Sequence, residues 1–254
     1  MKFGFCADLI QADKIAKMGY DYIEGGVGSI YSYTDDEYRQ RKQLLADSGI
    51  RCESCNGFVL GSVKTTGPDV SREKYMEYLK KSYERIAPLG TKIVVFGSGK
   101  SRYVPEDWTM KAAKEQLYNF SCDASDMAKD YGITIVLEVL NFKETNIINT
   151  MDEGAELVKK VNRENFKLLL DNYHYFYENT PLVQLKKFSD ILAHVHLSHP
   201  SLRTLPFAGD GYCYDDLFSV LKEMGYDGRV SMEAGYTSLE EDAPKALQLV
   251  QKYR

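Results

Sequence analysis

Short apolar runs alternate with longer, more polar segments along the whole chain, and each kind of segment has its own periodicity. A short continuous apolar run bounded by turn residues is typical of a buried strand, whereas apolar residues three or four positions apart are typical of an amphipathic helix. On this basis the sequence predicts strands at residues 2–6, 20–24, 50–56, 92–96, 133–138, 167–171, 191–196 and 228–233. Helices are predicted at residues 9–18, 34–48, 71–89, 109–131, 150–161, 214–224 and 239–253, and one more begins near Pro181.

The strict alternation of strands and helices predicts an α/β fold. Alternating units form a parallel sheet, and eight of them are expected to close into a (β/α)8 TIM barrel with its active site at the carboxyl ends of the strands. A doubly wound open sheet is the alternative, but it usually has a glycine-rich turn after its first strand, and here that turn is Cys6-Ala7-Asp8. No linker rich in proline, glycine or serine interrupts the pattern, so residues 1–254 are expected to form a single domain.

Four successive predicted strands end on an ionisable side chain: Glu138, Asp171, His196 and Glu233. One such residue alone often only caps the following helix or faces water. Four on neighbouring strands favour a common site, because the carboxyl ends of barrel strands meet at one rim. Carboxylate and imidazole ligands suit a divalent metal such as manganese, magnesium, cobalt or zinc.

Two of these residues begin longer sequence motifs. The segment that begins at Glu138 has the form ExxNxxE and ends at Glu144, and the segment that begins at Asp171 has the form DxxH and ends at His174. With the histidine of strand seven and the glutamate of strand eight, these motifs resemble the xylose-isomerase-like barrel superfamily of sugar isomerases and epimerases. Within it, the chain is most similar to ketose 3-epimerases of the tagatose/psicose (allulose) type, and the resemblance spans essentially the whole sequence.

The resemblance implies a metal-dependent sugar epimerase or isomerase. It implies that one divalent metal ion is bound by four residues: Glu138, Asp171, His196 and Glu233. The implied metal is manganese, cobalt or magnesium, with zinc as a further option. It implies that a small sugar or sugar-like substrate contacts three residues: Glu144, His174 and Arg203. The loop that carries Arg203 departs from the spacing usual in the family. A proton would leave the carbon beside the ketose carbonyl, the metal would stabilise the enediolate, and Glu138 and Glu233 would exchange the proton. A homodimer or homotetramer is also implied.

Other functions stay open on the same fold. Hydroxypyruvate isomerase and inosose dehydratase share the metal carboxylates, and a non-catalytic sugar-binding barrel is a further alternative. An abasic-site endonuclease of the same superfamily is less favoured, because such enzymes use three zinc ions and additional histidines. Here all four histidines follow residue 173, Asp210-Gly211-Tyr212 lacks the expected DxH pair, and the net charge of -5 speaks against a broad grip on nucleic acid.

The cysteines and the apolar segments bear on the cellular location. Five cysteines without a secretory signal are expected to be reduced thiols in the cytoplasm, and no apolar stretch is long enough to span a membrane. Cys52 and Cys55 form a CxxC pair, but on a strand they are expected to face opposite sides, which argues against a redox or zinc role.

A few other polar residues near strand ends have more than one interpretation. His194 is expected one layer below His196, in the core or in support of the metal ligands. Glu24 ends the second strand and is interpreted as a helix cap, a substrate contact or a support for the ligands. Lys100 and Arg102 follow the fourth strand and are expected either to meet an anionic substrate group or to be solvated at the rim.

Overall fold

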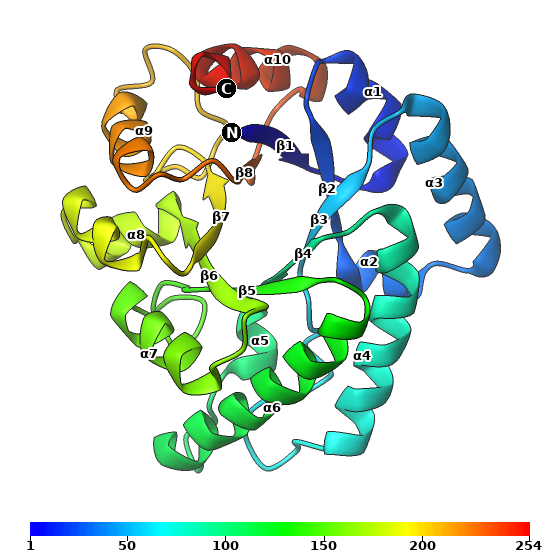
Figure 1. The fold of residues 1–254 in the computed structure, drawn as a ribbon, viewed down its shortest axis with the longest axis vertical. Helices are drawn as coiled ribbons and strands as arrows, with labels where there is room; N and C mark the ends of the chain where they lie inside the picture. Colours follow the sequence, from blue (N-terminus) through cyan, green and yellow to red (C-terminus); the bar gives the residue numbers. More distant parts are fainter.

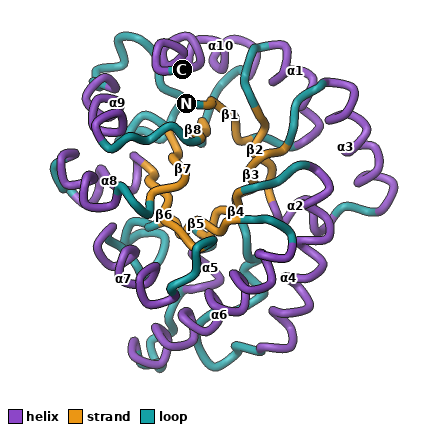
Figure 2. The backbone as a smooth tube through the Cα atoms, in the orientation of Figure 1, coloured by secondary structure: helices purple, strands orange, loops and turns teal.

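The computed structural model describes residues 1–254 and contains a closed barrel of eight parallel strands in sequence order. The barrel closes where β1 pairs with both β2 and β8, and helices surround the ring of strands (Figures 1 and 2). The strands are β1 (Lys2–Cys6), β2 (Tyr22–Gly26), β3 (Cys52–Asn56), β4 (Ile93–Phe96), β5 (Thr134–Glu138), β6 (Phe166–Asp171), β7 (Leu192–Leu197) and β8 (Arg229–Met232). The predicted TIM barrel is therefore confirmed, and the open sheet is excluded.

The helices include three short ones that periodicity does not reveal. The α-helices are α1 (Ala12–Lys17), α2 (Val27–Ser32), α3 (Asp35–Ser48), α4 (Arg72–Ile86), α5 (Gly99–Arg102), α6 (Met110–Asp130), α7 (Met151–Val161), α8 (Asn172–Glu178), α9 (Tyr214–Glu223) and α10 (Leu239–Val250). The 3-10 helices are η1 (Leu9–Gln11), η2 (Ala87–Leu89), η3 (Leu182–Phe188) and η4 (Gln251–Tyr253). Helices α2, α5 and α8 follow β2, β4 and β6 at the carboxyl rim, and they are too short to carry a helical repeat of apolar positions. No helix is both long and apolar enough to span a bilayer.

The core has two parts. Most apolar side chains pack between the strands and the outer helices, where they form one cluster of 60 buried residues. Inside the barrel, only the side formed by β4, β5 and β6 is lined by apolar residues: Ile93, Val95, Val136 and Leu169. The opposite side of the interior is polar, and its largest occupant is Tyr22, whose ring a side chain at Gly4 would overlap. The barrel interior thus carries buried polar groups directly below the rim.

An irregularity in β3 changes which side its residues face. Ile23 pairs with Cys52 but Glu24 pairs with Ser54, so Glu53 is an extra residue relative to β2. A bulge of this kind interrupts the alternation of side chains along a strand. As a result the sulfur atoms of Cys52 and Cys55 lie 3.5 Å apart in the buried outer core, and the two thiols are free. The prediction that they face opposite sides was wrong, because it assumed a regular strand.

Candidate metal centre

The four ionisable side chains predicted at the strand ends lie together at the carboxyl rim. Glu138 ends β5, Asp171 ends β6, His196 lies near the end of β7 in register with Asp171, and Glu233 directly follows β8. One possible ligand atom from each lies within 4.8 Å of the corresponding atoms of the other three. The distances from His196 Nδ1 are 3.4 Å to Glu138 Oε1 and 3.2 Å to Glu233 Oε2. The barrel therefore brings these residues to one point.

The atoms that face this point lack hydrogen-bond partners. Glu138 Oε1, Asp171 Oδ2 and His196 Nδ1 are buried and unpartnered. A buried polar atom without a partner is costly and is rarely found in a folded protein. All three are lone-pair donors of the types that bind divalent transition metals, so a cation would satisfy them together. The residues present therefore fit a metal ion.

The electrostatics of the cluster point the same way. Burial and then the Glu233 carboxylate raise the pKa of Glu138, and burial with the Glu138 carboxylate raises the pKa of Asp171 well above its usual range. Burial also acts on Glu233, but the adjacent His196 and then Arg203 outweigh it and lower the pKa of Glu233. Like-charged carboxylates this close favour protonation unless a cation lies among them.

Glu233 is held by two donors from other parts of the barrel. The side-chain amide of Asn56, the last residue of β3, donates to Oε1 at 2.9 Å. The guanidinium of Arg203 donates to Oε2 at 3.1 Å. Sequence reasoning missed Asn56, and the only signal that it offers is a polar residue at the end of a predicted strand.

The predicted substrate contacts lie beside the four-residue cluster. Arg203 also donates to Glu144 Oε1 at 2.8 Å, and its guanidinium lies over the ring of Tyr173. The backbone of Arg203 has a φ of 53°, a left-handed conformation that is unusual for a residue other than glycine. From this loop Arg203 reaches the cluster, where it contacts Glu233 and Asp171.

His174 presents one ring nitrogen to the same region. Its Nδ1 accepts hydrogen bonds from the backbone N–H and the side-chain amide of Asn141, at 3.2 and 2.9 Å. Burial lowers the pKa of His174 to about 3, so the ring is neutral and its proton resides on Nε2. Nε2 is unpartnered and lies 3.8 Å from Asp171 Oδ2. His174 therefore offers a fixed N–H donor at the edge of the cluster.

Of the two basic residues predicted in the loop after β4, Arg102 has a role other than the predicted one. The Arg102 side chain is fully buried and donates to the backbone carbonyls of Glu138 and Phe96, at 2.8 and 3.3 Å. Lys100 is exposed on α5. The prediction that Arg102 meets an anionic substrate or is solvated is therefore wrong, because α5 turns this side chain inward beneath the ends of β4 and β5. Gly97, also in this loop, leaves the space that the Glu138 carboxylate occupies.

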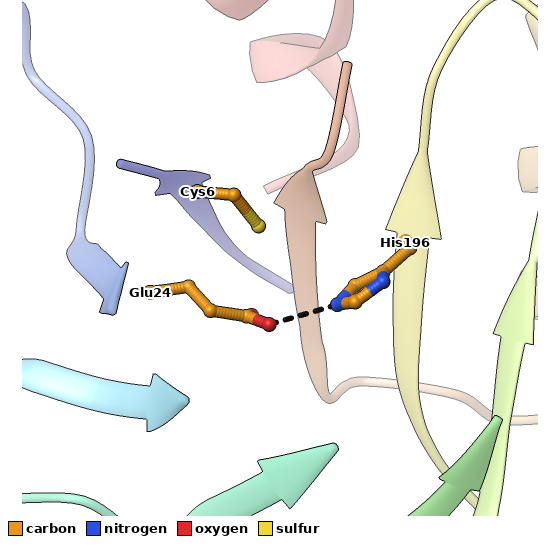
Figure 3. A group of neighbouring side chains, drawn as sticks. All are labelled: Cys6, Glu24 and His196. Atoms are coloured by element: carbon orange, nitrogen blue, oxygen red, sulfur yellow. Dashed lines mark hydrogen bonds and ion pairs between the residues drawn. The ribbon is translucent and has the colours of Figure 1, made fainter. Parts of the chain in front are cut away.

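A second group of possible ligands shares His196 with the first. Figure 3 shows Cys6 at the end of β1, Glu24 on β2 and His196 on β7 directed toward one another. The Nε2 atom of His196 is already bonded to Glu24 at 2.9 Å. Burial and the Glu24 carboxylate raise the pKa of the Cys6 thiol well above its usual value, which disfavours the thiolate that metal binding requires. The four-residue cluster is the better metal site.

Comparison with known proteins agrees with this arrangement. Residues 12–253 match the family described as "Xylose isomerase-like TIM barrel". D-psicose 3-epimerase of Agrobacterium fabrum is 27% identical over 226 residues, which are 87% of this chain and 77% of that protein. Inosose isomerase of Halalkalibacterium halodurans is 30% identical over 231 residues, covering 85% of this chain and 79% of the relative. The crystal structure of D-allulose 3-epimerase from Methylomonas sp. in complex with D-allulose superimposes with a TM-score of 0.87 at 24% identity, over 100% of this chain and 97% of that one. This chain belongs to the xylose isomerase-like TIM barrel family.

Proposed function

We propose that this protein epimerises or isomerises a ketose, with ketose 3-epimerisation as the favoured reaction, at a divalent metal bound by Glu138, Asp171, His196 and Glu233. The observation that carries the proposal is the convergence of three buried, unpartnered ligand atoms with the Glu233 carboxylate. The matched relatives are named as epimerases and isomerases, and this chain is an enzyme of that kind.

The four ligands would hold the ion at the centre of the rim. When bound, a divalent ion supplies Lewis-acid polarisation of a carbonyl and an adjacent hydroxyl, which makes the neighbouring C–H more acidic. Manganese, cobalt and magnesium suit this mixture of carboxylate and imidazole ligands, and zinc is a further option. A small sugar is the ligand class of the solved neighbours that contain D-allulose or D-fructose.

Glu138 and Glu233 are the proposed proton-transfer pair. They come from β5 and from the residue after β8, with β6 and β7 between them, so they approach the centre from different sides of the barrel. One carboxylate would take the proton from the carbon beside the carbonyl, and the other would return a proton from the opposite side, which inverts that carbon. Because both residues also contact His196, their positions are coupled through one imidazole.

The remaining polar groups of the rim would orient the substrate. The Nε2–H of His174 is a donor suited to a sugar oxygen, since Asn141 fixes the ring and the ring is neutral. Arg203 and Glu144 form an ion pair that provides both N–H donors and a carboxylate acceptor beside the centre. Positioned groups of this kind align the reacting carbon with the two catalytic carboxylates.

An inosose is a second candidate substrate, because the inosose isomerase of Halalkalibacterium halodurans is 30% identical to this chain. An inosose is a cyclic ketone with hydroxyl groups on the adjacent carbons, so the same proton transfer applies to it. The alternative of a three-zinc nuclease has less support: of the four histidines, only His196 belongs to a cluster of possible metal ligands. Assembly as a dimer or tetramer and a cytoplasmic location stay predictions.

The test is solvent deuterium exchange. The manganese-loaded protein would be incubated in D2O with D-psicose, D-fructose, D-tagatose, L-ribulose and an inosose, and NMR would follow deuterium entering each carbon. We expect label at C3 of a ketose; label at C1 would instead identify a 1,2-isomerase. Glu138→Gln and Glu233→Gln are expected to abolish exchange, and their bound manganese is measured separately so that lost metal and lost proton transfer are distinguished.

Glu53→Gln is the matched control for these variants. Glu53 is a carboxylate in the same barrel, bonded to Arg229 and Lys2 near the start of β1 and β8, and it belongs to neither cluster of possible ligands. This variant is expected to retain exchange. A metal-loaded wild type that labels none of these substrates would overturn the proposed ketose and inosose chemistry.

A further inference from the structure

We propose that Glu24 is a positioning residue for the metal centre: it fixes the ring and the tautomer of His196 so that Nδ1 faces the metal. The inference rests on the proposed function, because it presupposes that His196 is a ligand. Glu24 touches none of the three carboxylates of the cluster and would act only through the imidazole.

The contact between the two side chains is short and shielded from water. Glu24 Oε1 lies 2.9 Å from His196 Nε2, the bond drawn between them in Figure 3, and both side chains are fully buried. A hydrogen bond between a carboxylate and an imidazole N–H is stronger where water is excluded. The orientation of the His196 ring is therefore set from the side opposite the metal ligands.

The second oxygen of Glu24 is held just as firmly. Oε2 is bonded to His194 at 2.9 Å and accepts a hydrogen bond from Ser231 at 2.5 Å, and Ser231 in turn contacts the hydroxyl of Tyr22 at 2.7 Å. Residues of β2, β7 and β8 thus lock the carboxylate in one position.

The hydrogen bond to Glu24 decides which ring nitrogen of His196 can bind the metal. The Oε1 atom of Glu24 lies at hydrogen-bond distance from Nε2, and a carboxylate oxygen accepts from an imidazole N–H, so this contact places the proton of His196 on Nε2. In a neutral imidazole the other nitrogen then has a free lone pair, and Nδ1 is the unpartnered atom that faces Glu138 and Glu233. A metal-ligating histidine commonly donates its other N–H to a carboxylate in this way, and loss of that partner typically costs about 10- to 100-fold in metal affinity.

The experiment compares manganese affinity in metal-stripped wild type, Glu24→Gln and Glu53→Gln by isothermal titration calorimetry. Glutamine matches the size of glutamate but removes the charge, and its amide can donate to an imidazole nitrogen. We expect the Kd for manganese to rise about 10- to 100-fold in Glu24→Gln and to stay unchanged in Glu53→Gln. Ser231→Ala removes one hydrogen bond to Glu24 and leaves the bond between Glu24 and His196 in place, so its Kd is expected to lie between those of Glu24→Gln and the wild type.

A second readout separates positioning from general stability. In the zinc-loaded wild type, nitrogen-15 NMR is expected to show His196 protonated at Nε2 and metal-bound at Nδ1. In Glu24→Gln the Nε2–H signal is expected to move upfield or to be lost to exchange, with the fold intact by circular dichroism. If Glu24→Gln has the manganese affinity of the wild type and an unchanged His196 spectrum, this inference is overturned and the proposed function is unaffected. A wild type that binds no manganese would overturn the proposed function and this inference together.

Discussion

The side-chain amide of Asn56 donates a hydrogen bond to Glu233 Oε1 at 2.9 Å across 177 residues of sequence. Arg203 donates to the other oxygen of this carboxylate, whereas Glu138 Oε1 has no donor. The two proposed proton-transfer carboxylates therefore differ in their surroundings although both face the same histidine. Asn56 is the residue at which this difference can be tested without altering a metal ligand.

Asn56→Ala is expected to lower kcat/KM by about 10- to 100-fold, because a hydrogen bond to a charged group contributes about 1.5–3 kcal/mol. Steady-state kinetics on the ketose that exchanges deuterium would measure the loss. Asn165→Ala is the control, because the Asn165 amide donates to the carbonyls of Ser125 and Ile133, in contacts that include no residue of the cluster. Equal kinetics in the two variants would contradict a role for Asn56 in holding Glu233.

Metal binding is expected to stabilise the fold, because the unpartnered atoms of Glu138, Asp171 and His196 gain a partner. At a manganese concentration one hundred times the Kd, linkage contributes about 2.7 kcal/mol, or roughly 5 to 10 °C in Tm for a chain of this size. Thermal unfolding of metal-stripped protein titrated with manganese would measure the shift. Asp171→Asn is expected to lose most of it, and a wild-type Tm that does not depend on manganese would argue against the site.

Gly97→Ala is expected to weaken metal binding without unfolding the protein. A side chain at position 97 would overlap Glu138 Oε2, and the carboxylate is the partner that can move. Displacing one ligand by even a small distance disturbs the whole metal geometry, so we expect at least a ~10-fold rise in the manganese Kd. Calorimetry beside a circular dichroism spectrum would test this. Wild-type affinity in the variant would mean that Glu138 does not bind the ion from its present position.

Arg102→Met is expected to destabilise the barrel by roughly 2–4 kcal/mol. The substitution removes a buried cation that donates to the carbonyls of Glu138 and Phe96, and it leaves those carbonyls without that donor. Urea unfolding would measure the change. Lys100→Met, two residues earlier and exposed, is expected to stay within about 0.5 kcal/mol of the wild type. Similar stability of the two variants would show that the buried guanidinium contributes little.

The sequence by itself determined the order of the eight strands and the residues at their carboxyl ends. Periodicity and apolar runs reflect how each segment is buried, which is a local property of the chain, so Glu138, Asp171 and His196 could be placed at strand ends in advance. Their convergence followed because closure of the barrel gathers those ends at one rim.

Only the tertiary structure decided the partners of these residues. Asn56 meets Glu233, and Glu24 meets His196, across the closed barrel, so no local pattern marks either contact. The bulge at Glu53 that brings Cys52 beside Cys55 depends on the register between two strands. The inward turn of Arg102 depends on a helix too short to have a period. Hydrogen-bond partners are set by distances in the folded chain, and these distances exist only once the first and last strands have paired.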